Sequence, residues 1–161
     1  MGEFNVETFF SHDHEELDAA FVEFQKLKCI DYAAAKECFK KFKFGLQRHI
    51  VWEEQVLFPL FERATGIGEG GPTDVMREEH RLIKEALELI HKKVQQEDPG
   101  SDREESALLG VLKEHNNKEE SILYPAIDLM VSEQDRQLAF EEMKSVPSES
   151  YITCSCHRNE N

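Results

Sequence analysis

Two short segments of the chain carry histidine and glutamate at the same spacing. His49 and Glu53 stand four residues apart in HIVWEEQVLFP, and His115 and Glu119 stand four apart in HNNKEESILYP. Residues four apart share one face of an α-helix, so each pair can offer a ring nitrogen and a carboxylate oxygen to one centre. One such pair alone is more often a surface contact. Its repetition favours a metal site, in which a carboxylate can bridge two ions.

Two further histidines, His14 and His80, interrupt apolar stripes elsewhere in the chain. Judged singly, each would more often be a core histidine whose hydrogen bonds are satisfied. Their importance depends on where the helices place them.

Apolar residues recur three and four positions apart along most of the chain, which predicts an all-α fold. Short connections between long helices favour an up-down-up-down four-helix bundle with a short fifth helix near the C-terminus. Asp31 and Thr73 are the expected caps of the second and third helices. The expected ranges are 5–29, 31–64, 73–97 and 102–130, with the fifth helix ending near residue 144.

The inward-facing stripe of the fourth helix is predicted to include Leu108, Leu112, Ile122, Ala126 and Leu129. In both repeats a proline stands six residues after the glutamate, at positions 59 and 125. Proline removes a backbone donor and clashes with the preceding turn. We expect matched irregularities in the two helices.

Helix lengths, at about 1.5 Å per residue, bring the four histidines and two glutamates to one layer near the middle of the bundle. Burying these groups without partners would cost on the order of several kcal/mol. Metal ions would remove that cost. Six ligands exceed the three or four that a zinc ion usually takes, and they suit two iron or manganese ions.

The whole pattern resembles the hemerythrin-like, or HHE cation-binding, family over the chain up to about residue 144. The segments SHDHEEL, HIVWEEQVLFP, REEH and HNNKEESILYP carry this resemblance. It implies an oxo- or hydroxo-bridged pair of iron ions, with zinc or manganese as alternatives. The implied ligands are His14, His49, His80 and His115, with Glu53 and Glu119 as bridges.

The sequence departs from the oxygen-carrying hemerythrins that it resembles. Those proteins have five histidines, with an HxxxH pair on the third helix and a later Asp in place of the glutamate on the fourth helix. Here Met76 stands four residues before His80, and we expect its thioether to pack rather than bind iron. The ligand set is more similar to that of di-iron proteins associated with iron-centre repair and nitric-oxide stress. Those proteins carry an N-terminal cysteine segment that this sequence does not show.

The leading hypothesis is a non-haem di-iron protein that binds or reacts with O₂ or NO in sensing, detoxification or iron-centre repair. The alternative is an iron-responsive interaction module or an iron store without redox turnover. A zinc-bound or metal-free structural bundle is a third reading. Whether the protein is an enzyme is left open, and Phe10, Phe21, Leu46 and Ile83 are candidates for lining a gas pocket.

Charge and hydropathy exclude several classes of partner. The net charge is −14, and no Lys/Arg stripe interrupts it, so nucleic acid and anionic membranes are not expected to bind. No apolar run approaches the ~20 residues that span a bilayer. We expect a cytoplasmic monomer or weak dimer whose acidic surface or tail is available to a protein partner.

The chain is expected to divide into a di-iron bundle over residues 1–145 and a flexible tail over 146–161. Cys154, Cys156 and His157 in that tail could hold a metal transiently, pass iron to a client or sense oxidation. An ordinary reduced tail is the alternative, since one CxCH lacks a full ligand set. Nearer the layer, Glu54 and Glu120 are expected to be exposed, and Tyr124 is expected mainly to pack.

Overall fold

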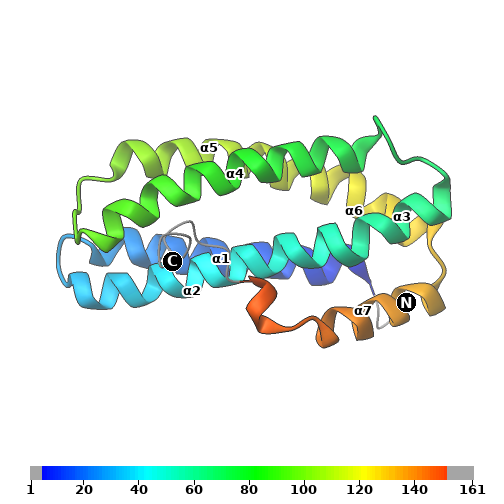
Figure 1. The fold of residues 1–161 in the computed structure, drawn as a ribbon, viewed down its shortest axis with the longest axis horizontal. Helices are drawn as coiled ribbons and strands as arrows, with labels where there is room; N and C mark the ends of the chain where they lie inside the picture. The colour runs from blue at the N-terminus through cyan, green and yellow to red at the C-terminus, as the bar shows by residue number, and fades with distance from the viewer. Residues whose placement is uncertain (1–4, 152–161) are drawn as a thin grey trace, which may run out of the picture.

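The structure is a computed structural model that describes residues 5–151. Four long helical segments run side by side, and the shorter α7 lies at one end of them (Figure 1). Among the described residues there is no β-strand, which confirms the all-α class. The elements are α1 (Val6–Leu27), α2 (Tyr32–Trp52), η1 (Glu53–Leu57), α3 (Phe58–Thr65), α4 (Pro72–Gln95), α5 (Asp102–Lys118), η2 (Glu119–Leu123), α6 (Tyr124–Met130), α7 (Glu133–Ser145) and η3 (Ser148–Tyr151).

The helices pack as two antiparallel pairs. α1 packs along α2, and α4 packs along α5, while α2 also meets α4 and α1 meets α6. The α1–α2 and α4–α5 turns lie at one end of the molecule, and the α3–α4 loop lies at the other (Figure 1). Of the helices within residues 5–151, none is long and apolar enough to cross a lipid bilayer.

Side-chain caps begin three of the helices. Asn5, Asp31 and Ser132 each accept a hydrogen bond from a backbone N–H three residues later. The predicted cap of α4 is wrong, because this helix begins before Thr73 with Pro72 at its first position. Proline has its φ preset for that position and needs no donor there. Thr73 is buried instead, and its hydroxyl has no hydrogen-bond partner among the described residues.

A π-helical turn begins at the glutamate of each repeat. The residue after the turn donates its backbone N–H to the carbonyl of the glutamate that opens it, Phe58 to Glu53 and Tyr124 to Glu119. The proline of each repeat is the next residue. A proline in a regular α-helix would clash with the carbonyl four residues back, and the wider turn relieves this. The matched irregularities that the prolines predicted are these two turns.

The second π turn overturns part of the predicted core. Ile122 and Leu129, expected to face inward, are 65% and 86% exposed, whereas Leu123 and Ile127 are buried. A π turn contains one residue more than an α-helical turn. Each side chain after it therefore takes the orientation that regular α-helical spacing would give to a neighbouring position. Simple periodicity therefore failed downstream of Glu119.

Two apolar clusters fill the bundle on either side of the histidine–glutamate layer. One contains Phe21, Phe24 and Phe42 and lies toward the α1–α2 turn. The other contains Phe10, Phe58 and residues of α6 and α7, toward the opposite end. The layer therefore lies between two regions from which packing excludes water.

The first residues assigned to the tail pack on the bundle. Tyr151 in η3 is buried, and its hydroxyl accepts a hydrogen bond of 2.9 Å from Trp52 Nε1. Packed structure therefore extends to Tyr151, beyond the expected domain boundary after residue 145. The tail residues Cys154, Cys156 and His157 lie outside the described residues.

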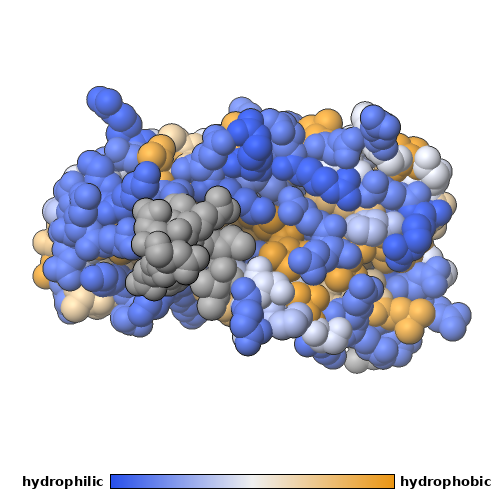
Figure 2. Space-filling view, in the orientation of Figure 1, coloured by the Kyte–Doolittle hydropathy of each residue, from blue (hydrophilic) through white to orange (hydrophobic). Residues whose placement is uncertain are grey.

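The face of the molecule drawn in Figure 2 is mostly hydrophilic, with smaller hydrophobic patches. The 33 acidic residues outnumber the 19 basic ones, so most of its charge is negative. A surface of this kind attracts cations and repels phosphate backbones.

Candidate metal centre

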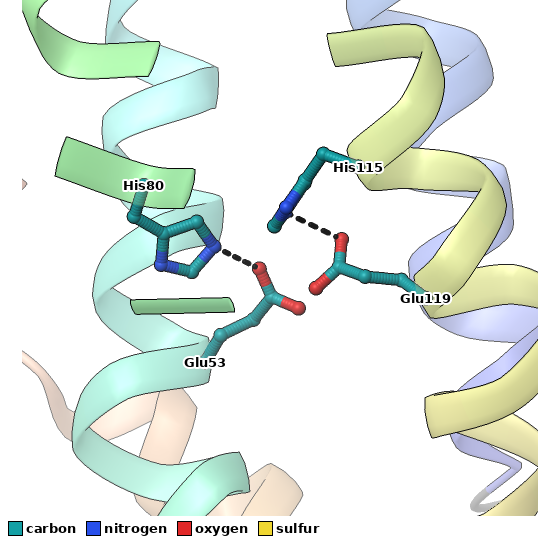
Figure 3. Close-up of side chains that lie close together, drawn as sticks. All are labelled: Glu53, His80, His115 and Glu119. Carbon is teal, nitrogen blue, oxygen red and sulfur yellow. Dashed lines mark ion pairs between the residues drawn. The ribbon is translucent and has the colours of Figure 1, made fainter. Parts of the chain in front are cut away.

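Six side chains from different turns of the bundle converge in the predicted layer. None is more than 5% exposed, although all are polar or charged. Figure 3 shows Glu53 and Glu119 reaching toward each other from facing helices, with an imidazole beside each. The six are His14 on α1, His49 near the end of α2, Glu53 at the start of η1, His80 on α4, His115 on α5 and Glu119 at the start of η2.

Each glutamate stands between two imidazoles. In every case the contact joins the ring Nε2 to one carboxylate oxygen, Oε1. Neighbouring ligands of one ion, each about 2.1 Å from it, lie roughly 3 Å apart, so separations of this size suit coordination. The distances are 3.3 Å for His49–Glu53, 3.2 Å for His80–Glu53, 3.1 Å for His115–Glu119 and 3.3 Å for His14–Glu119.

The donor atoms fall into two sets, each compact enough for a single ion. Within each set one ligand atom per residue lies within 4.8 Å of the others, and Glu119 belongs to both sets. A carboxylate shared in this way can bridge two cations. The sets are Glu53, His80, His115 and Glu119, and His14, His49 and Glu119.

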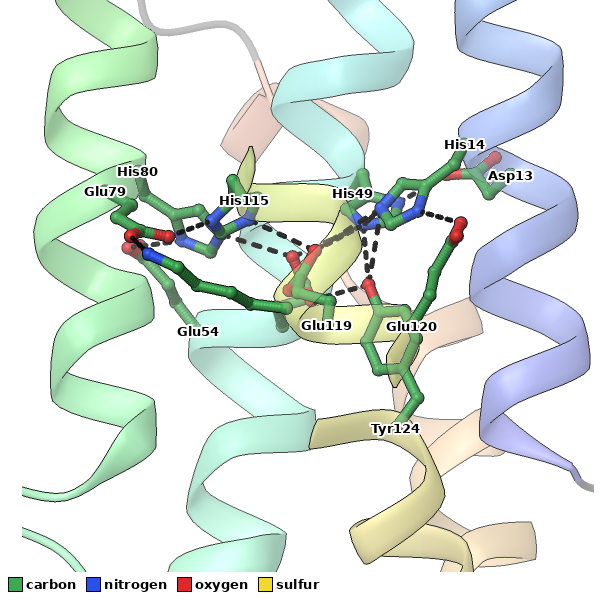
Figure 4. A network of polar contacts seen from close by, with 12 residues as sticks. Asp13, His14, His49, Glu54, Glu79, His80, His115, Glu119, Glu120 and Tyr124 are labelled. Atoms are coloured by element: carbon green, nitrogen blue, oxygen red, sulfur yellow. Dashed lines mark hydrogen bonds and ion pairs between the residues drawn. The ribbon is translucent and has the colours of Figure 1, made fainter. Parts of the chain in front are cut away.

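A ring of four outer carboxylates orients the imidazoles (Figure 4). Each histidine donates through Nδ1 to a carboxylate on a neighbouring helical segment, since an ionised carboxylate only accepts. That bond leaves Nε2 facing the centre, as in metal sites whose histidines are held by a carboxylate behind them. The bonds are His14 to Glu120 (2.8 Å), His49 to Asp13 (2.7 Å), His80 to Glu54 (3.2 Å) and His115 to Glu79 (3.0 Å).

Sequence reasoning missed this ring. Glu54 and Glu120 were expected to be exposed, but their side chains are only 28% and 40% exposed and each bonds a histidine. The expectation assumed that a residue next to a ligand on the same helix is rotated away from the centre. Each of these carboxylates is instead rotated toward the adjacent helix, where it meets another histidine. All four outer carboxylates are direct neighbours in sequence of a residue in the layer, which is a signal that could have found them.

Tyr124 belongs to the centre and does more than pack. Its side chain is fully buried, and its hydroxyl donates to Glu53 Oε2 over 2.9 Å. The hydroxyl oxygen of Tyr124 also lies 3.2 Å from His49 Nε2 and 3.4 Å from His14 Nε2. The π turn of η2 places Tyr124 here, because it ends immediately before this residue.

The buried atoms at the centre lack the partners that water or protein would give them. Among the described residues, Glu53 Oε1, both carboxylate oxygens of Glu119 and His80 Nε2 are buried without a hydrogen-bond partner. Buried polar atoms normally find one. Here carboxylate oxygens face imidazole Nε2 atoms. Both are hydrogen-bond acceptors when the imidazole proton is on Nδ1. A cation between them satisfies them all, so the donor set fits a metal ion.

Without a cation, protons balance the charge. Burial alone would lower the pKa of His49, but the charge of Glu53 and the bond to Asp13 raise that pKa to about 10. Burial likewise opposes the hydrogen bonds to Glu53 and Glu54 that raise the pKa of His80 to about 9. A metal ion must displace these protons from Nε2, so binding releases protons.

A small cavity adjoins the centre. Its volume is about 10 Å³, close to what one water molecule needs, and His14, His49 and His115 line it. Of the residues expected to line a gas pocket, Leu46 and Ile83 do border this cavity, whereas Phe10 and Phe21 do not.

Met76 and two further histidines lie outside the centre. Met76 is buried in the apolar cluster, as expected. The side chain of His12 is 69% exposed. His91 stacks on Phe39, with ring centroids 6.3 Å apart. These positions leave the layer with four histidines.

Comparisons with known proteins agree with this chemistry. A model of the hemerythrin HHE cation binding domain matches residues 6–127. An uncharacterized hemerythrin-like protein of Schizosaccharomyces pombe is 31% identical over 147 residues, which cover 86% of this chain and 69% of the relative.

Two bacterial relatives carry a functional name. The iron-sulfur cluster repair protein YtfE of Yersinia pseudotuberculosis is 34% identical over 89 residues, and that of Yersinia pestis is 33% identical over 89. Each match covers 50% of this chain and 40% of the relative, so the chain spans less than half the length of these repair proteins. No solved structure matches.

Proposed function

Because the chain belongs to the hemerythrin HHE cation-binding family, we propose that it is a non-haem iron protein with two iron ions in the layer. One observation carries this proposal. Two glutamates and four imidazoles are buried together, and the Nε2 atoms of the imidazoles are turned toward the carboxylates. Within the part of the chain that the structure describes, three of the four carboxylate oxygens lack a hydrogen-bond partner. A binuclear site uses every one of these donors.

The proposal assigns a role to each side chain. His14 and His49, whose Nε2 atoms lie 3.2 Å apart, bind one ion. His80 and His115, whose ring centroids lie 4.8 Å apart, bind the other. Glu119, shared by both donor sets, would bridge the ions. Glu53, which contacts His49 over 3.3 Å and His80 over 3.2 Å, would bridge them from the opposite helix.

When bound, the two iron ions would supply electrons and an open position for O₂ or NO. The chain contributes the environment. The apolar clusters exclude bulk water, and a cavity of about 10 Å³ lies beside His14, His49 and His115. The hydroxyl of Tyr124 holds one oxygen of Glu53, which limits how far that carboxylate can swing.

Repair of damaged iron centres is the cellular role that the named relatives support, and the role that the ligand set resembles. The alternative is an iron store or iron-responsive interaction module without redox turnover. Both roles suit the cytoplasmic location expected from the sequence. They differ in whether the metal changes oxidation state during use.

The test is metal analysis of anaerobically purified protein, followed by visible absorption spectra on reduction and on separate exposure to O₂ and NO. Two irons per chain and spectra that change with either gas support the proposal. The double variant His49→Ala/Glu119→Ala should lose the metal, while His12→Ala, which changes an exposed histidine, should keep it. Iron that is bound but inert to both gases favours the store, and zinc in place of iron contradicts the proposal.

A further inference from the structure

A groove runs along the surface between α1 and α5. Its volume is about 1030 Å³. The polar contacts between these two helical segments gather at its ends, where Lys28 and Gln25 pair with Glu105 and where His14 meets Glu120. Between those ends α1 packs on α2 and α5 packs on α4, which leaves the space open.

The groove is open to solvent at Gly110 in α5. Gly110 is exposed, and a Cβ placed on it would have no neighbouring atom within 4 Å. An alanine therefore fits here without narrowing the groove, whereas a large side chain at this position would extend into it.

The inner wall of the groove reaches the metal centre. His14, Asp18, Leu112 and Asn116 line both the groove and the small cavity beside the histidines. These shared residues place the groove next to that cavity. His14 in turn contacts Glu119 over 3.3 Å, and both carboxylate oxygens of Glu119 are buried without a hydrogen-bond partner among the described residues. The groove therefore adjoins the place where a cation is needed.

The charge along the groove suits a cation. Its lining includes the carboxylates of Glu15, Asp18, Glu114 and Glu120 against a single lysine, Lys113. Asp18 stands four residues after His14, so both lie on the same face of α1. A groove lined by one sign of charge raises the local concentration of the opposite ion and its rate of arrival. A neutral diatomic ligand gains nothing from such a lining.

We propose that the groove between α1 and α5 is the route by which the metal ion reaches the buried centre, with Asp18 as the last carboxylate before His14. This inference rests on the proposed metal-binding function. The groove gives the direction from which the metal ion approaches. Asp18 changes the rate at which the ion binds rather than the stability of the final complex.

The experiment follows ferrous iron uptake by the metal-free full-length protein under anaerobic conditions, by rapid mixing and by final metal content. Gly110→Trp fills the groove, and Gly110→Ala is its matched control. Asp18→Asn removes one charge, and Glu16→Gln removes one charge from an exposed position on the same helix. We expect uptake to slow about tenfold or more in Gly110→Trp and several-fold in Asp18→Asn, with final iron content unchanged. Both controls should load at the wild-type rate, and added salt should slow the wild type.

The outcomes separate this route from the function on which it rests. Wild-type protein that binds no iron overturns the metal-binding function itself. Normal iron content with equal uptake rates in Gly110→Trp and wild type overturns the route. Slow uptake in Gly110→Trp with an unchanged rate in Asp18→Asn shows that iron enters by the groove without the help of Asp18, and it overturns the role assigned to that carboxylate. Circular dichroism establishes that each variant is folded, and Asp18→Asn tests the route if Gly110→Trp is not.

Discussion

Each imidazole of the centre is fixed from behind by a carboxylate on another helical segment. The four bonds connect α1 to α2, α2 with its π turn to α4, α4 to α5, and α5 with its π turn back to α1. Orientation of the Nε2 atoms that face the centre is therefore coupled to the packing of the whole bundle. A carboxylate behind the ring also fixes the tautomer and makes Nε2 a better donor to a cation.

Removing one of these carboxylates should weaken metal binding without removing a ligand. In Asp13→Ala the ring of His49 loses its partner at 2.7 Å, and we expect the affinity for iron to fall about 10- to 100-fold. Asp13→Asn should lose less, because an amide oxygen still accepts from Nδ1. Competition with a chelator of known affinity measures both. Wild-type affinity in Asp13→Ala would show that the bond does not position the ring.

The raised pKa values predict how the stability of the metal-free protein depends on pH. The ordinary pKa of 6.5 rises to about 10 for His49 and about 9 for His80. The folded state thus holds these protons more tightly than the unfolded state. Their contribution to stability is complete below about pH 6.5 and is lost as pH rises through about 9 to 10. Denaturant unfolding in excess chelator should show a midpoint that falls from neutral to alkaline pH, and His49→Gln should flatten that fall. A midpoint that rises would contradict the assignment.

At the residue scale, the sequence predicted the two histidine–glutamate pairs because their spacing is local. His49 with Glu53 and His115 with Glu119 follow from helical geometry alone. The partners of Glu54 and Glu120 lie on other helices. Finding such partners requires the rotation of each helix about its axis, which spacing along one helix does not provide.

At the scale of elements, each π turn lies between the helix that carries a histidine of the layer and the helix that continues into the apolar core. Glu53 and Glu119 open these turns, and the hydroxyl of Tyr124 enters the centre from the first residue after the second turn. The turn rotates the downstream core by about one residue. The paired prolines indicated an irregularity, but a proline marks a kink, a break or a π turn equally well, so its kind was not predictable.

The rotated register can be tested by two neighbouring substitutions. Leu123 is 3% exposed, and Leu123→Ala should lower the free energy of unfolding by about 2–5 kcal/mol, because it leaves a cavity in the core. Ile122 is 65% exposed, and Ile122→Ala should change it by no more than about 0.5 kcal/mol. Urea denaturation of both variants measures the difference. A larger loss for Ile122→Ala would mean that the helix continues with regular α-helical spacing.

At the scale of the whole molecule, a buried polar layer divides the apolar interior into two clusters. Hydrophobic packing within each cluster holds the helices together, while the layer opposes it through desolvated carboxylates and imidazoles. A bound cation would change the sign of that contribution, since it would satisfy the buried atoms that have no hydrogen-bond partner within residues 5–151. The stability of the bundle should therefore depend on metal, even though most of the core does not touch the centre.

Metal removal should lower the thermal midpoint of the wild-type protein, and adding ferrous iron back anaerobically should restore it. A ligand that binds only the folded state at 100 times its dissociation constant stabilises by about 2.7 kcal/mol, so the shift should grow with free metal concentration. The variant Glu53→Gln/Glu119→Gln removes both shared carboxylates and should melt at the same temperature with or without metal. Calorimetry of the two proteins, each with chelator and with iron, makes the comparison. A wild-type protein that binds iron in the layer but melts at an unchanged temperature would show that the layer is equally satisfied by protons, and that the cation is not what stabilises it.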